Sequence, residues 1–318
     1  MADYVRISTI GTPPLAVDAG LSDQAVVEQV IAHLQKELDQ VLPDKPDLIV
    51  LPECCDRPGV FNYQPERLNA YYRVRGSQVL DRLAGVARAH RCYITYPAKW
   101  MMGDGTFRNS IQMLDRQGRV MGRYHKNHLI SCEYTEGGVL YGKEAPLMAC
   151  DFGKVACVIC FDLNFDELRL KYAAAKPDLI LFSSMYHGGL MQSYWAYSCR
   201  AHFVGAIAKT AVPSAIISPV GMTLASTTNY FDFVTATVNL DCCVAHLDGN
   251  WEKLRALKKK YGPEVTITDP GYLGSVLIAS ETKACRARDM VREFQIELLD
   301  DYFTRSLAHR HAPGHMEA

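Results

Sequence analysis

A short apolar run that ends on a cysteine constrains the fold more than any other feature. Residues 155–159 read Val-Ala-Cys-Val-Ile and lead into Cys160 and a segment of helical character. The run predicts a strand, so Cys160 stands at a strand-to-helix junction, close to free backbone amides and a positive dipole end that favour a thiolate. A cysteine in an apolar strand is more commonly a small core residue. The position suits a nucleophile, and two further segments favour that interpretation.

Each of these upstream segments places a charged residue at the end of a predicted strand. The apolar strand 48–51 leads to the carboxylate of Glu53, and Lys126 follows a later strand-like stretch. Alone, Glu53 would be a strand end and Lys126 a solvated surface lysine. Because strands of one sheet deliver their terminal residues to a common rim, the carboxylate, the ammonium and the Cys160 thiol can converge.

The order of these motifs resembles the carbon-nitrogen hydrolase family, also called the nitrilase superfamily. The pattern reads Leu-Pro-Glu at 51–53, Lys-x-His-Leu at 126–129 and Cys-x-Asp-x-x-Phe-x-Glu-Leu at 160–168. The resemblance covers most of the chain, from about residue 4 to residue 241. It implies an α/β fold, the four-layer α-β-β-α sandwich of the nitrilase superfamily, and an enzyme that hydrolyses non-peptide C–N bonds.

The resemblance also implies a role for each motif residue. Cys160 would be the nucleophile, and Glu53 the general base that takes the thiol proton, passes it to the leaving nitrogen and later activates water against the thioester. Lys126 and the backbone N–H of Phe161 would hold the oxyanion. Lys126 is therefore expected to act electrostatically and not as a proton shuttle.

A second glutamate is expected between the lysine and the cysteine. Family amidases carry one a few residues before a glycine, where it hydrogen-bonds the lysine and helps to position the substrate. Glu133 and Glu136 are both candidates, and Glu136, which precedes Gly137 and Gly142, matches that pattern better. The alternative is that both carboxylates lie on a surface turn.

The residues beside the nucleophile narrow the expected reaction. Cys-Phe-Asp at 160–162 matches the amidase and carbamoylase branches, whereas strict nitrilases tend to read Cys-Trp-Glu. Leu163 and Asn164 stand where carbamoyl amino acid hydrolases commonly carry a basic residue that holds the substrate carboxylate. A small neutral amide is therefore the favoured substrate, with an N-carbamoyl compound or a nitrile as the alternative. A preference for N-carbamoyl acids would require an arginine outside the motif, such as Arg200.

The segment after the next predicted strand lines the substrate pocket in this family. The strand 178–182 leads to Tyr186 and His187, which are expected near the substrate together with Asn164. Polar loop residues at a helix start are as often caps or surface groups, so both interpretations remain open.

Composition argues against several other function classes. A formal net charge of -1 over 318 residues provides no electrostatic footprint for nucleic acid or an anionic membrane. No apolar stretch of about 18 residues could span a bilayer, and no signal peptide precedes the first strand. The odd count of 11 cysteines then favours reduced thiols in the cytoplasm.

A metal-binding or redox protein is the rival class that the cysteines suggest. Cys157 and Cys160 form a C-x-x-C pair. However, positions three apart in a strand point to opposite faces, and no second pair exists to complete a zinc site. No metal and no cofactor is therefore expected.

The rest of the chain alternates predicted strands and helices. Residues 1–245 are expected to form the hydrolase domain, and residues 246–318 a C-terminal extension that packs on that domain or at a subunit interface. The extension should contain a charged helix near 251–261, a Pro/Gly-rich link over 263–274 and a terminal helix over 289–307. Such tails often build subunit contacts in this family, so a homodimer or higher homo-oligomer is expected.

Overall fold

The computed structural model describes residues 3–59, 64–209 and 211–317. The chain divides into two compact units, a larger one of Val5–Val238 and a smaller one that comprises Met1–Tyr4 and Asn239–Ala318. The boundary expected at residue 245 therefore lies inside the smaller unit.

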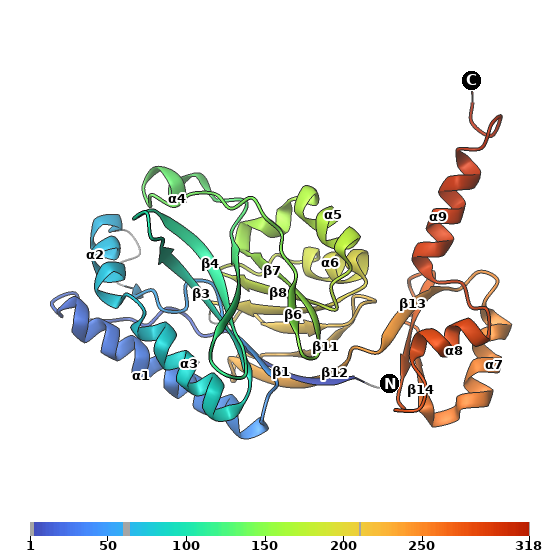
Figure 1. Ribbon diagram of the computed structural model, residues 1–318, viewed down its shortest axis with the longest axis horizontal. Helices are drawn as coiled ribbons and strands as arrows, with labels where there is room; N and C mark the ends of the chain where they lie inside the picture. The colour runs from blue at the N-terminus through green and yellow to red at the C-terminus, as the bar shows by residue number, and fades with distance from the viewer. Residues whose placement is uncertain (1–2, 60–63, 210, 318) are drawn as a thin grey trace. The chain divides into compact units, whose positions relative to one another are not determined.

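Two six-stranded sheets form the centre of the larger unit (Figure 1). The first has the order β12 (Phe233–Asn239), β1 (Tyr4–Ile10), β2 (Leu48–Val50), β3 (Tyr93–Met101), β4 (Phe107–Leu114) and β5 (Val120–His125). The second has the order β11 (Thr223–Ser226), β10 (Ala215–Ile217), β9 (His202–Ile207), β8 (Leu179–Ser184), β7 (Gly153–Ile159) and β6 (Met148–Cys150).

Both sheets are mixed, with parallel strands at their centres. β2 pairs in parallel with β1 and β3, and β8 pairs in parallel with β7 and β9. Antiparallel strands extend each sheet, through β4 and β5 in the first and through β10 and β11 in the second. Because parallel neighbours end at the same edge, the residues that follow β7 and β8 emerge side by side.

Helices flank the two sheets and complete the sandwich. Figure 1 shows α1 (Asp23–Val41), α2 (Pro65–Arg75) and α3 (Gln78–His90) beside the first sheet, and α5 (Asp166–Ala175) and α6 (Met191–Cys199) beside the second. This arrangement confirms the predicted α/β fold with an α-β-β-α sandwich.

The periodicity of the sequence explains why α1 was predictable and α2 was not. The hydroxyl of Ser22 accepts the N–H of Ala25 and caps α1, and apolar residues repeat along one buried stripe of that helix. In α2 the buried face includes two tyrosines and Arg75, so no apolar stripe marks the helix. The hydrophobic periodicity of the sequence therefore does not predict α2.

The smaller unit contains a sheet that the sequence analysis did not anticipate. Its three antiparallel strands have the order β13 (Cys242–His246), β15 (Ser275–Ser280) and β14 (Val265–Thr268). α7 (Trp251–Tyr261) and α8 (Ala287–Glu293) pack their apolar residues into a core with this sheet. This core is distinct from that of the first sheet in the larger unit.

Two predictions for this region were wrong. The expected link over 263–274 contains β14. The expected terminal helix over 289–307 is in fact two helices, α8 and α9 (Leu299–Arg310). The break falls at Gln295, whose φ of 50° is left-handed and cannot continue a right-handed helix.

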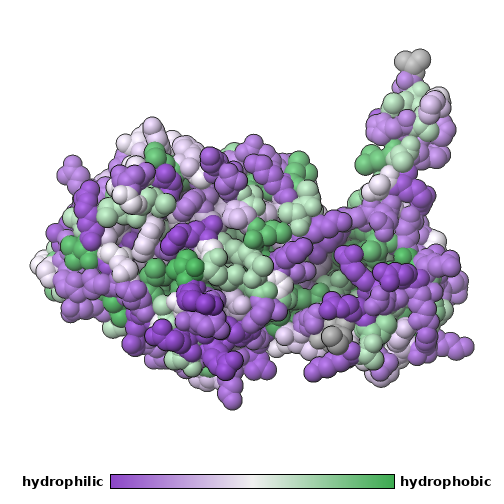
Figure 2. Space-filling model, viewed as in Figure 1, coloured by the Kyte–Doolittle hydropathy of each residue, from purple (hydrophilic) through white to green (hydrophobic). Residues whose placement is uncertain are grey.

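Hydrophilic residues dominate the molecular face drawn in Figure 2, and apolar residues gather there in small patches. Within the described ranges, no helix is both long enough and apolar enough to cross a membrane.

Candidate active site

Glu53 lies just beyond the C-terminal end of β2, in a turn that is hydrogen-bonded to strands of both sheets. Its side chain is buried, with 4% of the residue exposed. Two residues earlier, the carbonyl of Leu51 accepts a hydrogen bond from Ser183 Oγ on β8 at 2.8 Å, and the Leu51 N–H donates to Thr95 Oγ1 on β3 at 2.9 Å. These contacts fix the position from which the Glu53 carboxylate projects.

Several donors converge on the Glu53 carboxylate. Oε1 accepts from Lys126 Nζ at 3.0 Å and from Asn109 Nδ2 at 2.8 Å, while Oε2 accepts from the backbone N–H of Met185 at 3.1 Å. The thiol of Cys160 is also hydrogen-bonded to this carboxylate. Burial would raise the pKa of Glu53, but the Lys126 charge and these donors lower it overall. The carboxylate is therefore ionised and able to accept a proton.

Lys126 follows β5 and lies between two carboxylates. Its buried Nζ donates to Glu133 Oε2 at 2.7 Å as well as to Glu53. Burial alone would lower the pKa of Lys126, but the two carboxylates raise it well above its ordinary value. An ammonium has three N–H donors, so one remains beyond the two that these carboxylates use.

The partner of Lys126 is Glu133, and the sequence-based preference for Glu136 is corrected. Glu133 lies in α4 (Ser131–Thr135), where its carboxylate also accepts the backbone N–H of Ile130 at 3.0 Å. Glu136 is the residue after that short helix, and its side chain is exposed. The prediction of Glu136 from its spacing to the glycines was wrong because a short helix begins at Ser131. This helix turns the Glu133 side chain toward Lys126.

Asn109 joins the two carboxylates and was missed by the sequence analysis. Its Nδ2 donates to Glu53 at 2.8 Å and to Glu133 Oε1 at 2.9 Å. It lies within β4, and its backbone carbonyl accepts the N–H of Lys126 at 2.8 Å. Nothing in the local sequence marks an asparagine inside a strand, because its partners come from distant segments.

Cys160 begins the short 3-10 helix η3 (Cys160–Asn164) at the end of β7. Its φ of 47° is left-handed, a conformation that a non-glycine residue keeps only where its surroundings enforce it. Burial and the negative charge of Glu53 raise the pKa of the thiol to about 12, against the opposing effects of Lys126 and the Met185 N–H. The proton therefore resides on sulfur while Glu53 is ionised, so attack by sulfur requires proton transfer to Glu53.

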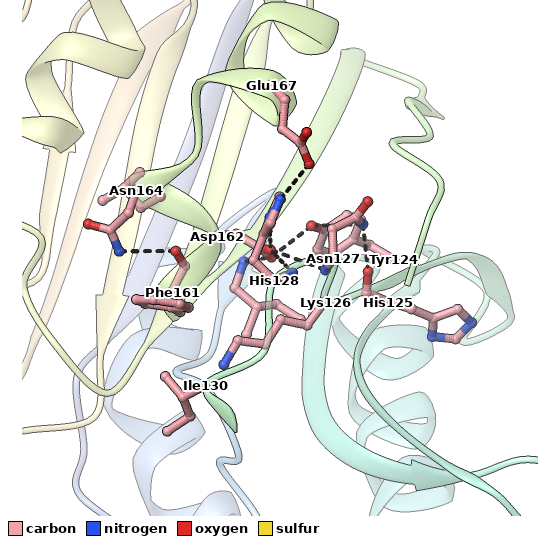
Figure 3. Close-up of polar contacts among 12 residues, drawn as sticks. Tyr124, His125, Lys126, Asn127, His128, Ile130, Phe161, Asp162, Asn164 and Glu167 are labelled. Atoms are coloured by element: carbon pink, nitrogen blue, oxygen red, sulfur yellow. Dashed lines mark hydrogen bonds and ion pairs between the residues drawn. The ribbon is translucent and has the colours of Figure 1, made fainter. Parts of the chain in front are cut away.

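Asp162 connects the Cys160 turn to the loop that carries Lys126 (Figure 3). The fully buried carboxylate has five contacts with nitrogen or hydroxyl groups: Tyr124 Oη at 2.7 Å, the backbone N–H groups of Asn127 at 3.1 Å, His128 at 2.7 Å and Ile159 at 3.1 Å, and His128 Nδ1 at 3.0 Å. A single side chain thus sets the position of the thiol relative to the ammonium. The motif contained Asp162 and His128, but their role as a connection emerged only from the structure.

His128 extends this connection to α5. Its Nε2 lies 2.7 Å from Glu167 Oε1, and its ring stacks on Phe165 with ring centroids 3.9 Å apart. Burial would lower the pKa of His128, but hydrogen bonds and charge interactions with Asp162 and Glu167 raise it overall. The His128 ring therefore bridges the nucleophile turn and the helix that follows it.

The predicted substrate-binding residues separate into two groups. Asn164 Nδ2 donates to the hydroxyl of Tyr186 at 3.0 Å. Burial raises the pKa of Tyr186 to about 12, and the negative charge of a Cys160 thiolate would add to this effect. His187 instead accepts the N–H of Gly189 within its own loop at 3.1 Å. The Arg200 guanidinium lies over the Tyr197 ring, 4.7 Å from its centroid.

No group of three or more His, Cys, Asp or Glu side chains within residues 3–59, 64–209 and 211–317 is arranged to hold a metal ion. The chemistry that these residues can perform is that of a thiol, a carboxylate base and a fixed ammonium.

Comparison with known proteins agrees with this geometry. Residues 15–245 match the family described as Carbon-nitrogen hydrolase. The chain is 28% identical over 180 residues to "Hydrolase in pqqF 5'region" of Pseudomonas protegens, covering 56% of this chain and 58% of that protein. It is 23% identical over 189 residues to omega-amidase NIT3 of Saccharomyces cerevisiae, covering 55% of this chain and 65% of that protein. The match thus spans about three fifths of the length of these curated relatives.

Solved structures share the fold at low sequence identity. Nit3 of Saccharomyces cerevisiae aligns with a TM-score of 0.61 at 15% identity, covering 85% of this chain and 97% of that one. An amidase from Nesterenkonia sp. aligns with a TM-score of 0.61 at 17% identity, covering 79% of this chain and 95% of that one. These likenesses show a common architecture of two sheets flanked by helices.

Asp162→Asn should destabilise the protein. The amide keeps the shape of the side chain but removes its charge and replaces an acceptor with a donor, and each buried donor left unsatisfied costs about 1–3 kcal/mol. We expect the free energy of unfolding in urea to fall by at least about 3 kcal/mol. The exposed Asp166→Asn is the control, with an expected change below about 1 kcal/mol. Unchanged stability of Asp162→Asn would contradict the connecting role.

His128→Gln should reveal a pH-dependent contribution to stability. Because the pKa of folded His128 lies above the ordinary value of 6.5, its stabilising charge is fully present below that pH and is lost as pH rises through the raised pKa. The difference in free energy of unfolding between wild type and variant should be larger at about pH 6 than at about pH 9. A difference that grows with pH would show that the neutral imidazole makes the important contacts.

Proposed function

The chain belongs to the carbon-nitrogen hydrolase family, and we propose that it is an amidase that hydrolyses a small non-peptide amide through a thioester on Cys160. The observation that carries the proposal is the ionised Glu53 carboxylate, which contacts both the Cys160 thiol and the Lys126 ammonium. This arrangement pairs a nucleophile with a base and places a cation where negative charge develops.

Acylation begins with attack of Cys160 Sγ on the amide carbon. Glu53 takes the thiol proton as the S–C bond forms, and the carbonyl electron pair moves to oxygen. The remaining N–H donor of Lys126 and the backbone N–H of Phe161 are the proposed oxyanion donors. Glu53 then gives its proton to nitrogen, the C–N bond breaks, and ammonia or an amine leaves the acyl group on sulfur.

Deacylation uses the same groups with water as the nucleophile. The water oxygen attacks the thioester carbon while Glu53 accepts a proton from that water. The oxyanion then forms again beside Lys126. The C–S bond then breaks, the proton returns to sulfur, and the carboxylic acid departs. Glu133 holds Lys126 in place throughout and transfers no proton.

Relatives and neighbours support a small amide as the substrate. One Nesterenkonia amidase structure is described as showing covalent addition of the acetamide moiety of fluoroacetamide at the active site cysteine, and another is in complex with butyramide. Relatives include omega-amidases and deaminated glutathione amidases. A carbamoylase or nitrilase activity is the alternative. The homo-oligomeric state and the cytoplasmic location stay predictions.

Substitutions in the charge cluster test the mechanism. Cys160→Ala should abolish ammonia release, and Glu53→Gln and Lys126→Met should each lower kcat at least about 100-fold, because each removes a group that acts in the transition state. Glu133→Gln should be more harmful than its matched control Glu136→Gln, which lies outside the cluster. Retained activity in any of the first three variants would remove that residue from the mechanism.

The substrate class can be tested with compounds that share one carbon skeleton. Simple neutral amides should give a higher kcat/KM than the matching nitriles or N-carbamoyl amino acids, because the site offers a proton to a leaving nitrogen and no cation beside Leu163 or Asn164. Hydroxylamine should intercept the thioester as a hydroxamate. The highest kcat/KM for an N-carbamoyl acid would favour the carbamoylase alternative.

A further inference from the structure

Arg57 brings a guanidinium to the edge of the charge cluster. It lies in the same turn as Glu53, where its backbone N–H donates to the Cys54 carbonyl at 2.9 Å. Its partly buried side chain reaches Met185, with Nη2 3.8 Å from Sδ. The backbone N–H of Met185 in turn contacts Glu53 and Cys160. Met185 therefore contacts both the Arg57 guanidinium and the reacting sulfur.

The guanidinium has no carboxylate partner within the described part of the chain. Its buried Nε–H lacks any hydrogen-bond acceptor, and the thioether of Met185 is a weak one. The adjacent carboxylate, Asp56, is already used by Arg75, whose Nη1 lies 2.6 Å away. A buried donor without an acceptor costs free energy, so a ligand with an anionic acceptor would gain affinity by accepting this N–H.

The charges around the cluster leave an excess of positive charge. Glu53 and Glu133 balance Lys126 and Arg57, and the thiol is neutral. Lys99 adds a further cation near Glu133: its Nζ donates to Asn69 Oδ1 at 2.9 Å and to the carbonyl of Gly137. Burial lowers the pKa of Lys99 to about 8, so it is still mostly protonated at neutral pH. A pocket with this balance attracts anionic ligands.

We propose that Arg57 binds a carboxylate on the acyl part of the substrate, so that the preferred substrates are monoamides of small dicarboxylic acids. This inference rests on the proposed amidase function. A guanidinium offers paired N–H donors that match the two oxygens of a carboxylate. An anchor on the acyl part stays in use through both half-reactions, because the acyl group remains on Cys160 after ammonia has left.

The proposal revises the expectation of a neutral substrate. That expectation considered only the positions next to the nucleophile, where Leu163 and Asn164 carry no charge. Arg57 reaches the site from the end of a different strand, in the other sheet. The absence of a basic residue beside Cys160 therefore leaves room for an anchor elsewhere.

The test compares succinamate with butyramide, which differ mainly in a terminal carboxylate. Wild-type protein should convert succinamate and water to succinate and ammonium with a kcat/KM at least about tenfold above that for butyramide, on the scale of a charge-assisted hydrogen bond. In Arg57→Gln, the ratio of the two kcat/KM values should fall at least about tenfold, mostly through the KM of succinamate. Arg57→Lys should lie between, because it keeps the charge but loses the paired donors.

Control variants separate this role from a structural one. Arg82→Gln removes the same charge from an exposed site on α3 and should leave the ratio unchanged. Succinate should raise the melting temperature of Cys160→Ala more than that of Cys160→Ala with Arg57→Gln, a readout that needs no turnover. An equal loss for both amides in Arg57→Gln, or no wild-type preference for succinamate, would overturn the inference.

The remaining outcomes distinguish the two proposals. Hydrolysis of butyramide without a preference for succinamate would reject the Arg57 anchor and leave the amidase function standing. Release of ammonia from neither amide by wild-type protein would reject the amidase function itself. Preference for N-acetylglycine, whose carboxylate lies on the amine part, over succinamate would overturn the placement of the anchor on the acyl part.

Discussion

The buried charge cluster of Glu53, Lys126 and Glu133 is the interaction on which the active site depends. Removing ions from water costs several kcal/mol per ion, and the cost is offset only where the geometry is good and further hydrogen bonds satisfy each group. Asn109 bonds both carboxylates, and the Met185 N–H bonds Glu53. The three charged residues and Asn109 come from the first sheet and the segments that follow its strands, whereas the Met185 N–H and the Cys160 thiol come from the second. The site is therefore complete only when the two sheets have packed together.

The same cluster determines the resting state of the nucleophile. With the pKa of Cys160 raised to about 12 and that of Glu53 lowered, the proton stays on sulfur in the site without substrate. In the proposed mechanism, an amide carbonyl that docks against Lys126 changes this balance, since the charge that leaves Glu53 on protonation reappears on the oxyanion beside the ammonium. Sulfur thus becomes reactive only when an acceptor is in place, which protects the thiol from unselective chemistry.

Local sequence predicted the site residues that stand at strand ends. It failed to predict the features that depend on contacts between distant segments. The residues that follow β2, β5 and β7 were expected to converge at the rim of one sheet. The structure does bring them together, but across two sheets, because β7 belongs to the second. Glu133 could not be separated from Glu136, since the choice depends on where a helix of five residues begins. The sheet of the smaller unit was missed for two reasons. β13 pairs with β15, whose residues follow 29 to 37 positions later, and the β14 partner of β15 lies in the segment that was expected to be a Pro/Gly-rich link.

The turn after β2 carries both the proposed general base, Glu53, and the proposed substrate anchor, Arg57. Its charged side chains contact different neighbours. Glu53 faces the thiol and the ammonium, while Asp56 turns to Arg75 on α2. The Asp56–Arg75 ion pair matters for the proposed substrate anchor, because Asp56 is adjacent to Arg57 and would otherwise be available to neutralise it. Arg75 also lies over the rings of Tyr72 and Trp100, at 5.0 and 5.4 Å from their centroids, which holds it in the interior. The buried Arg75–Asp56 ion pair thereby keeps Asp56 from Arg57, which in our proposal leaves the Arg57 guanidinium available to a substrate carboxylate.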